Sequence, residues 1–192
     1  MSQCTVLGVV VTVVEILERQ SITYHLGGSF ASTVHGLPRQ TNDVDIVVDL
    51  SPGQGQRLAV ALADGFYVDA SVVADAVARR ASFNAVHLAT GFKVDFFVKG
   101  AGEYDDLELR RSIREQIAAD PPRTAAVKSA EDTVLRKLQW FRDGGGVSDR
   151  QWGDVLGILK AQRNRLDIAY LEGWARRLDV LDLLARARAD AE

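Results

Sequence analysis

The sequence predicts an α+β protein in which a mixed β-sheet flanked by helices is followed by a C-terminal helical half. The first observation is an alternating apolar run over Thr41–Leu50, in which every second side chain would face a core. The second is a pair of strand-like runs, Phe83–Ala89 and Phe92–Val98, joined by a Thr-Gly turn. The third is the helical spacing of apolar residues late in the chain. We therefore expect an α/β core over 1–125 and a helical region over 126–192 packed on it.

The other N-terminal elements follow from apolar periodicity and from turn residues. Apolar residues recur three or four positions apart near the N-terminus, which is the spacing of one helix face. Gly36 and Pro38 mark the end of a short helix. The expected elements are a helix over 1–20, a strand over Ser21–His25, and helices over Ser29–His35, Gln54–Ala63 and Asp69–Arg80.

The chain between 99 and 123 is polar, and we assign it no regular element. Ser129, with Asp132 three residues later, resembles the start of a capped helix that runs to about Phe141. Three consecutive glycines, 144–146, then break the pattern. Further helices are expected over Asp149–Gln162 and Ile168–Ala189.

Composition excludes several classes of protein. The 192 residues include 23 Lys and Arg and 26 Asp and Glu, for a formal net charge of −3, so a strongly basic nucleic-acid coat is excluded. With 47% hydrophobic residues, the chain is not a disordered acidic polymer. One cysteine, Cys4, cannot build a disulfide framework or a Cys-rich zinc module. The apolar run Thr5–Val14 is too short to span a bilayer. We expect a cytoplasmic protein without a membrane partner.

Three aspartates are the candidate catalytic residues. Asp43 and Asp45 are two apart on a predicted strand, so both side chains leave the same face. Asp95 lies within the apolar run Phe92–Val98, where a lone carboxylate is costly unless it is paired or binds a metal. If the two strands are neighbours, the three carboxylates form a cluster that suits Mg²⁺. The alternative is that these are ordinary solvated aspartates.

A glycine-rich turn precedes the aspartates. Gly27 and Gly28 would let the backbone approach a ligand, and the N–H groups of the following helix would point at an anion. Ser29 could donate to a phosphate oxygen, although Ser is also a common helix cap. Thirteen residues separate Ser29 from Asp43. Together, the glycine-rich turn and the three aspartates predict a site for a metal-bound triphosphate.

This pattern resembles the signature of the polymerase-beta-type nucleotidyltransferase superfamily, and most of all the small bacterial AbiEii-like nucleotidyltransferases. The resemblance extends from about residue 24 to about residue 185. The residues in the register of the AbiEii-like pattern are Gly27, Gly28, Ala31, Gly36, Arg39, Thr41, Asp43 and Asp45.

The resemblance implies a nucleotidyltransferase fold and transfer of a nucleoside monophosphate from an NTP to an acceptor hydroxyl, with release of pyrophosphate. By the same resemblance, Asp43, Asp45 and Asp95 would bind two Mg²⁺ ions, or Mn²⁺. Asp95 would also help to deprotonate the acceptor. Gly28 and Ser29 would bind the β- and γ-phosphates. Two metal ions would stabilise the attacking and leaving oxygens.

Several residues outside the cluster each have two candidate roles. Lys137 would neutralise triphosphate charge or pair with a neighbouring turn, and Arg39 would bind phosphate or stabilise its loop. Arg150 and Asp154 match the family pattern, but their spacing also suits a structural salt bridge. Relatives often have charged residues where this chain has glycines 144–146.

A local basic patch is formed by Arg110, Arg111 and Arg114. It is interpreted as a solvated helix face, or alternatively as a contact for an acceptor RNA.

The function predicted from sequence is Mg²⁺-dependent nucleotidyl transfer to an RNA, protein or small-molecule acceptor. The AbiEii-like resemblance also implies a toxin–antitoxin setting with an antitoxin partner. The alternative is a catalytically inactive nucleotide-binding or protein-interaction module of the same fold. A glycosyltransferase that uses Asp-x-Asp would need a larger sugar-nucleotide domain.

Overall fold

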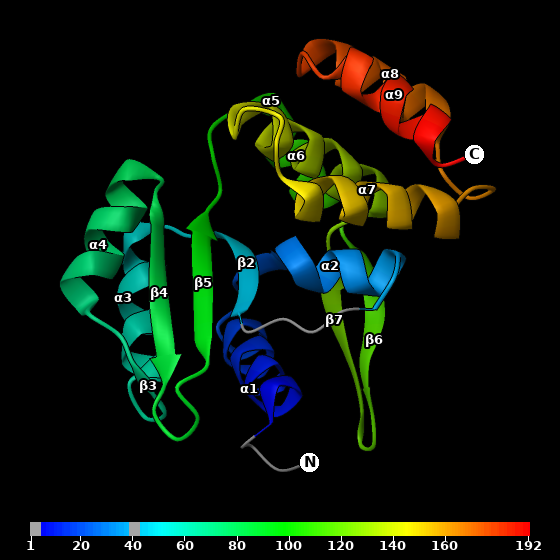
Figure 1. Ribbon diagram of the computed structural model, residues 1–192. Coiled ribbons are helices and arrows are strands. Elements are labelled where there is room, and N and C mark those ends of the chain that lie inside the picture. The colour runs from blue at the N-terminus through cyan, green and yellow to red at the C-terminus, as the bar shows by residue number, and fades with distance from the viewer. Residues whose placement is uncertain (1–4, 39–42) are drawn as a thin grey trace. The chain divides into compact units, whose positions relative to one another are not determined.

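The computed structural model describes residues 5–38 and 43–192 (Figure 1). The chain divides into two compact units. The sheet unit comprises Met1–Gly27 and Thr41–Val127, and the helical unit comprises Gly28–Gln40 and Lys128–Glu192. The helical unit thus includes an early segment of the chain, 28–40, as well as its C-terminal part. The expected domains, 1–125 and 126–192, stay a prediction.

A seven-stranded mixed sheet forms the sheet unit, with the strand order β3-β4-β5-β2-β1-β7-β6. β2 and β5 are parallel neighbours, β1 and β7 are also parallel, and the other pairs are antiparallel. The strands are β1 (Thr23–Leu26), β2 (Asp43–Asp49), β3 (Phe66–Tyr67), β4 (Ser82–His87), β5 (Lys93–Val98), β6 (Ile113–Ala119) and β7 (Pro122–Val127).

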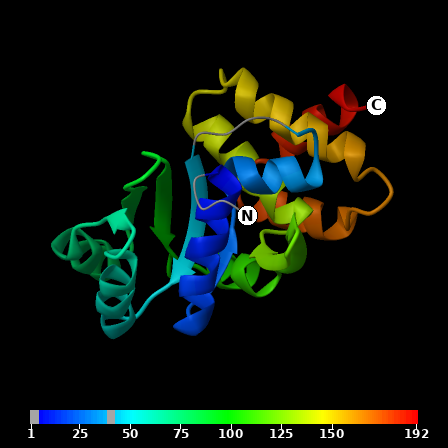
Figure 2. The ribbon, with the colours of Figure 1, turned by 90° about the horizontal axis from the view of Figure 1, so that it is seen from below.

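The two faces of the central strands differ in burial. Val44, Ile46 and Val48 of β2 are buried, whereas the alternate side chains of the same strand are half-buried or exposed. This pattern is the period-2 alternation of a strand with one face on a core. The helices α1, α3 and α4 lie on the buried side of the sheet (Figure 2). The helices of the sheet unit are α1 (Val6–Arg19), α3 (Pro52–Leu62), α4 (Ala70–Arg79) and α5 (Glu103–Arg110).

The helical unit is built on apolar helix faces. Its helices are α2 (Gly28–His35), α6 (Ala130–Asp143), α7 (Asp149–Ala161), α8 (Ile168–Arg177) and α9 (Leu181–Asp190). Ser129 caps α6 as predicted, because its hydroxyl accepts from the Asp132 N–H at 3.1 Å. A Cβ at Gly36 would lie 3.0 Å from backbone atoms of Gly157 and Ile158, so glycine lets this end of α2 approach α7.

The fold class predicted from sequence is confirmed: a mixed sheet with flanking helices is accompanied by a helical C-terminal half. The main omission lies in the polar stretch 99–123, which contains α5 and most of the β6–β7 hairpin. Much of this hairpin is exposed, and a bulge between Gln116 and Ala118 interrupts the ladder. Little apolar alternation is therefore present for a sequence pattern to detect. No helix in the described ranges is long and apolar enough to cross a membrane.

Candidate active site

The three predicted aspartates lie on neighbouring strands of the sheet unit. In the parallel pairing of β2 with β5, Asp45 is directly opposite Asp95, and Asp43 is opposite Lys93. Neighbouring strands are ~4.8 Å apart, and directly opposed side chains leave the same face. All three carboxylates therefore project from the less buried face, and each is half-buried. The structure brings together the residues that the sequence proposed as one cluster.

Apolar residues of the opposite face hold this arrangement. Val44 and Ile46 alternate with the two aspartates of β2, and Val94 and Phe96 flank Asp95. Each of these four side chains is at most 1% exposed. A shift of one residue in register would place the carboxylates in the core. Burial of these four apolar side chains therefore fixes the face from which the aspartates project.

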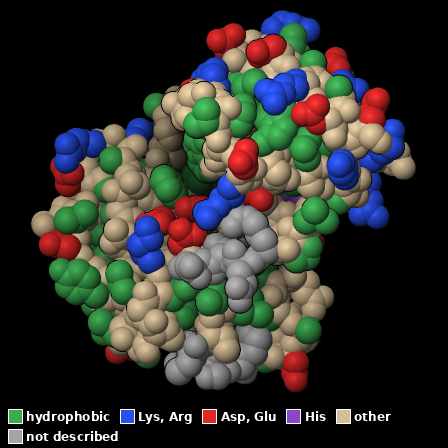
Figure 3. All heavy atoms as spheres, viewed as in Figure 1, with side chains coloured by type: hydrophobic (Ala, Val, Ile, Leu, Met, Phe, Trp, Pro, Cys, Tyr) green, Lys and Arg blue, Asp and Glu red, His purple; other side chains and the backbone are tan. Residues whose placement is uncertain are grey.

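A lysine lies within the carboxylate cluster, and the sequence analysis did not identify it. Lys93 is two residues before Asp95 on β5, and its Nζ lies 2.8 Å from Asp95 Oδ2. The hydrogen bond to Asp95 raises the pKa of Lys93, although desolvation opposes the shift, and the charges of Asp95, Asp43 and Asp45 raise it further. The Lys93 ammonium is therefore a cation in the field of all three carboxylates. In Figure 3, acidic side chains gather over β2 and β5 with basic side chains beside them.

The donor chemistry of this cluster suits a hard divalent cation. Carboxylate oxygens are the ligands that Mg²⁺ prefers, and the Lys93 ammonium, a cation, is already bonded to one of these carboxylates. In the ranges 5–38 and 43–192, no three His, Cys, Asp or Glu side chains are arranged as a metal site. The residue types fit a metal, and their use as ligands stays a prediction.

Polar and aromatic side chains continue across the same face of the sheet. Asn84 of β4 is opposite Asp95, and Val86 is opposite Lys93. Phe97 is 37% exposed, and Tyr67 of β3 is 68% exposed. Beside the carboxylates, this face therefore offers an amide and two accessible aromatic rings.

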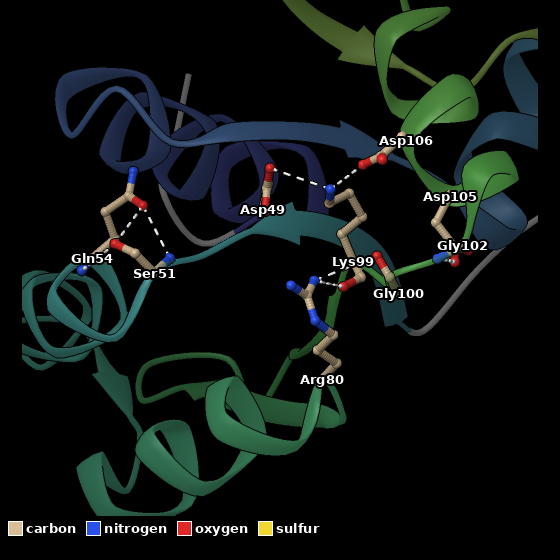
Figure 4. Close-up of polar contacts among 9 residues, drawn as sticks. All are labelled: Asp49, Ser51, Gln54, Arg80, Lys99, Gly100, Gly102, Asp105 and Asp106. Carbon is tan, nitrogen blue, oxygen red and sulfur yellow. Dashed lines mark hydrogen bonds and ion pairs between the residues drawn. The ribbon is translucent and has the colours of Figure 1, made fainter.

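The opposite end of β2 carries a separate charged cluster, which the sequence analysis also missed (Figure 4). Lys99 Nζ is bonded to Asp106 and lies 3.6 Å from Asp49 Oδ2. The hydrogen bond to Asp106 raises the pKa of Lys99, and the pKa of Asp106 is lowered in return. Arg80 donates to the carbonyls of Lys99 and Gly100 at 2.9 and 3.4 Å. These contacts tie the end of β5 to α4 and α5, which is a structural role.

The predicted phosphate turn begins α2. Gly27 ends the sheet unit, and its N–H donates to the Asp45 carbonyl at 2.8 Å. Gly28 has a φ of +49°, a left-handed conformation that glycine adopts without strain. Ser29 is the next residue of α2 and is half-buried. The glycine requirement has a physical basis, while phosphate binding by Gly28 and Ser29 stays a prediction.

Lys137 is buried inside the helical unit. Its Nζ lies 2.7 Å from Asp154 Oδ2, and it donates to Gln151 Oε1 at 3.0 Å. The two charged side chains are 3% and 9% exposed. Asp154 of α7 is thus a partner of Lys137, whereas Arg150 is exposed on the same helix. A direct role for Lys137 at a triphosphate stays a prediction, and Arg39 lies outside the described residues.

The basic patch does not form one helix face. Arg110 ends α5, Arg111 follows it, and Arg114 is on β6. Arg114 binds Glu18 at 2.6 Å and Thr124 Oγ1 at 2.7 Å. The interpretation of the three arginines as a single solvated helix face is therefore wrong. Their contact with an RNA stays a prediction.

The fold is that of nucleotidyltransferases. The chain aligns with the antibiotic-resistance factor ANT(2'')-Ia at 13% identity and a TM-score of 0.51, covering 96% of this chain and 93% of that one. It aligns with a nucleotidyltransferase-like antigen of Paracoccidioides brasiliensis at 16% identity and a TM-score of 0.55, covering 95% and 92%. A candidate nucleotidyltransferase of Thermotoga maritima gives 15% identity and a TM-score of 0.51, covering 77% and 92%.

These likenesses concern the fold. No protein-family model matches the sequence. No curated protein matches it either.

Proposed function

We propose that this protein is a Mg²⁺-dependent nucleotidyltransferase that transfers a nucleoside monophosphate from an NTP to an acceptor hydroxyl. The observation that carries the proposal is the β2–β5 register, in which Asp45 is opposite Asp95 and Asp43 lies on the same face. The nucleotidyltransferase fold supports it independently.

In the proposed reaction, the acceptor hydroxyl oxygen attacks the α-phosphorus of the NTP. The new bond joins the acceptor oxygen to this phosphorus, and the bond from the α-phosphorus to the α,β-bridging oxygen breaks. Pyrophosphate leaves with that oxygen. The hydroxyl proton passes to Asp95, whose carboxylate is half-buried and 19% exposed at its side chain. A general base must lie within hydrogen-bond reach of the proton that it removes.

Asp43, Asp45 and Asp95 would hold the metal ions, which would offset the charge of the phosphates and stabilise the attacking and leaving oxygens. Gly28 and Ser29 would bind the β- and γ-phosphates with backbone and hydroxyl donors. The N–H of Gly27, the residue before them, is bonded to the carbonyl of Asp45. This bond supports the proposal because it fixes the residue that precedes the phosphate turn beside the carboxylate strand.

For the acceptor, a small polyhydroxylated molecule is the first class to test. ANT(2'')-Ia has been solved with adenylyl-2''-tobramycin, and this chain aligns with that structure at 11% identity and a TM-score of 0.50, covering 95% of this chain and 98% of that one. An RNA 3′ end and a protein hydroxyl are the other acceptors implied by the sequence. An antitoxin partner belongs to the AbiEii-like resemblance alone.

The test is pyrophosphate release by the full-length protein with each NTP, Mg²⁺ and a panel of acceptors of these three classes. Asp45→Asn should lower the rate at least about 100-fold, because it removes a charged group that acts on the transition state. Asp64→Asn is the matched control, since Asp64 is exposed and lies outside the cluster. Equal rates for the wild type and Asp45→Asn would contradict the proposal.

A second candidate is a nucleotide-binding module without turnover, and the Lys93–Asp95 bond is the observation that favours it. A permanently engaged Asp95 could neither bind metal nor accept a proton. This candidate predicts NTP binding in equilibrium dialysis without pyrophosphate release for any acceptor of the panel.

A further inference from the structure

Lys93 lies beside the three carboxylates of the cluster, but the proposed chemistry gives it no role. It is on β5 directly opposite Asp43, and it is bonded to Asp95 on its own strand. The strand geometry alone places it there, because residues 93 and 95 must leave the same face. The strand therefore fixes which face the Lys93 side chain leaves, as it does for the aspartates.

The positive charge of Lys93 reduces the repulsion among the three carboxylates. Three carboxylates on the same face of two neighbouring strands repel one another, and repulsion between like charges disfavours their joint ionisation. One ammonium group at 2.8 Å from Asp95 offsets part of this repulsion. A divalent cation bound by the same carboxylates would offset more of it, and it would also repel the ammonium.

We propose that Lys93 is a tethered counterion of the cluster, which neutralises Asp95 when no divalent cation is bound and must leave Asp95 when one binds. Lys93 thereby sets the affinity of the cluster for metal. The inference rests on the proposed function in its choice of ligand, a divalent cation.

The contrast with Lys99 explains why Lys93 can leave. The Lys99 side chain is 13% exposed and is held by two aspartates, Asp49 and Asp106. The Lys93 side chain is 46% exposed, so its ammonium can move into solvent without a large loss of burial. Exposed ion pairs contribute little net free energy, and a competing cation can replace them.

The primary experiment is a Mn²⁺ titration of the full-length protein after chelator treatment, read by calorimetry. We expect Lys93→Met to bind Mn²⁺ roughly tenfold more tightly than the wild type, because one unit charge near the ion is removed. Lys93→Arg keeps the charge and should bind within about twofold of the wild type. Lys160→Met is the matched control, because Lys160 is exposed on α7, outside the sheet unit, and should change nothing.

A second measurement locates the effect at Asp95. In the background of Asp95→Asn, the tenfold gain from Lys93→Met should shrink to about twofold or less, since the competition is for that carboxylate. In chelator, Lys93→Met should melt below the wild type, and excess Mn²⁺ should raise its Tm more than it raises the Tm of the wild type. The Lys93→Arg protein should melt as the wild type does.

Equal Mn²⁺ affinity of the wild type and Lys93→Met would overturn the inference, as would weaker binding by the variant or absence of binding by both. The inference would also be overturned if Lys93→Met still raised the Mn²⁺ affinity tenfold in the Asp95→Asn background. Pyrophosphate release decides the proposed function separately. A protein without transferase activity can still show the affinity shift, and an active one can lack it.

Discussion

Two lysine–aspartate pairs with nearly equal separations show how burial changes the role of the same contact. Lys93 and Asp95 are 2.8 Å apart on the open face of the sheet, with side chains 46% and 19% exposed. Lys137 and Asp154 are 2.7 Å apart between α6 and α7, with side chains 3% and 9% exposed. Exposed pairs contribute little to stability and can exchange partners, whereas breaking a buried pair leaves a charge without compensation. The first pair is therefore suited to function and the second to architecture.

The sharpest test of this comparison is the loss of each lysine. Lys137→Met should lower the free energy of unfolding by about 3–5 kcal/mol, because it leaves Asp154 in a buried site without its ammonium partner. Lys93→Met should lower it by about 1 kcal/mol or less. Urea unfolding measures both values. The double variant Lys137→Met, Asp154→Leu should recover part of the loss, and similar losses at positions 93 and 137 would refute the distinction.

The two faces of β2 allow the same comparison with apolar residues. Ile46 is 0% exposed, and Val47 on the opposite face is half-buried. Ile46→Ala should cost about 2–5 kcal/mol through lost burial and the cavity that remains. Val47→Ala should cost roughly 1 kcal/mol or less, because fewer buried groups are removed. Chemical unfolding of both variants checks the difference, and an equal loss would show that the face with the carboxylates is covered as fully as the other.

The buried side chain of Tyr24 should make the stability of the folded protein depend on pH. Burial and, to a smaller extent, the hydrogen bond that its hydroxyl donates to Glu18 together raise the pKa of Tyr24 to about 12. The folded protein therefore keeps this proton at pH values where the unfolded chain, with a Tyr pKa of about 10, loses it. The resulting stabilisation is complete below about pH 10 and is lost as the pH rises toward about 12.

Urea unfolding over this pH range, together with the tyrosinate absorbance of the folded protein, measures the effect. Tyr24→Phe should flatten the decline in stability across that window. A decline that is unchanged in Tyr24→Phe would assign it to other groups.

Helix caps provide the smallest expected effects. Ser51 caps α3 in a two-sided capping box, with its N–H bonded to Gln54 Oε1 at 3.0 Å. Ser148 caps α7 through one contact with the Gln151 N–H at 3.4 Å. Each change to Ala should cost about 0.5–1 kcal/mol, with the larger value at Ser51. Thermal unfolding checks the order, and Ser51→Asp, which can still cap, is the control.

The elements that the sequence predicted are those with a strong local signal. The alternation in Thr41–Leu50 identified β2, the Ser129 cap identified the start of α6, and Gly36 marked the end of α2. The register of Asp45 with Asp95 is different, because it depends on which strands become neighbours. The sequence could predict a cluster of the three aspartates only on the condition that the two strands are neighbours, and in the structure they are.

Other features depend on contacts between distant parts of the chain. The spacing of Lys93 and Asp95, two residues apart on a predicted strand, was a signal for their shared face, but the position of Lys93 opposite Asp43 follows only from the pairing of β5 with β2. The buried pair of Lys137 with Asp154 depends on how α6 packs against α7. Tyr170 of α8 donates to Asp132 at 2.6 Å, and this contact also joins residues that are distant along the chain. Long-range contacts of this kind follow from packing rather than from local spacing.

The interleaved order of the two units constrains any attempt to divide the molecule. The helix α2 belongs to the helical unit, where it contacts α6 and α7, yet it is encoded before β2. A fragment that stops at Val127 would keep α2 while losing both of these partners, and the buried side chains Ala31, Ser32 and His35 would be exposed to water. Such a fragment should be prone to aggregation. A soluble sheet fragment would instead require replacing 28–40 with a short polar linker.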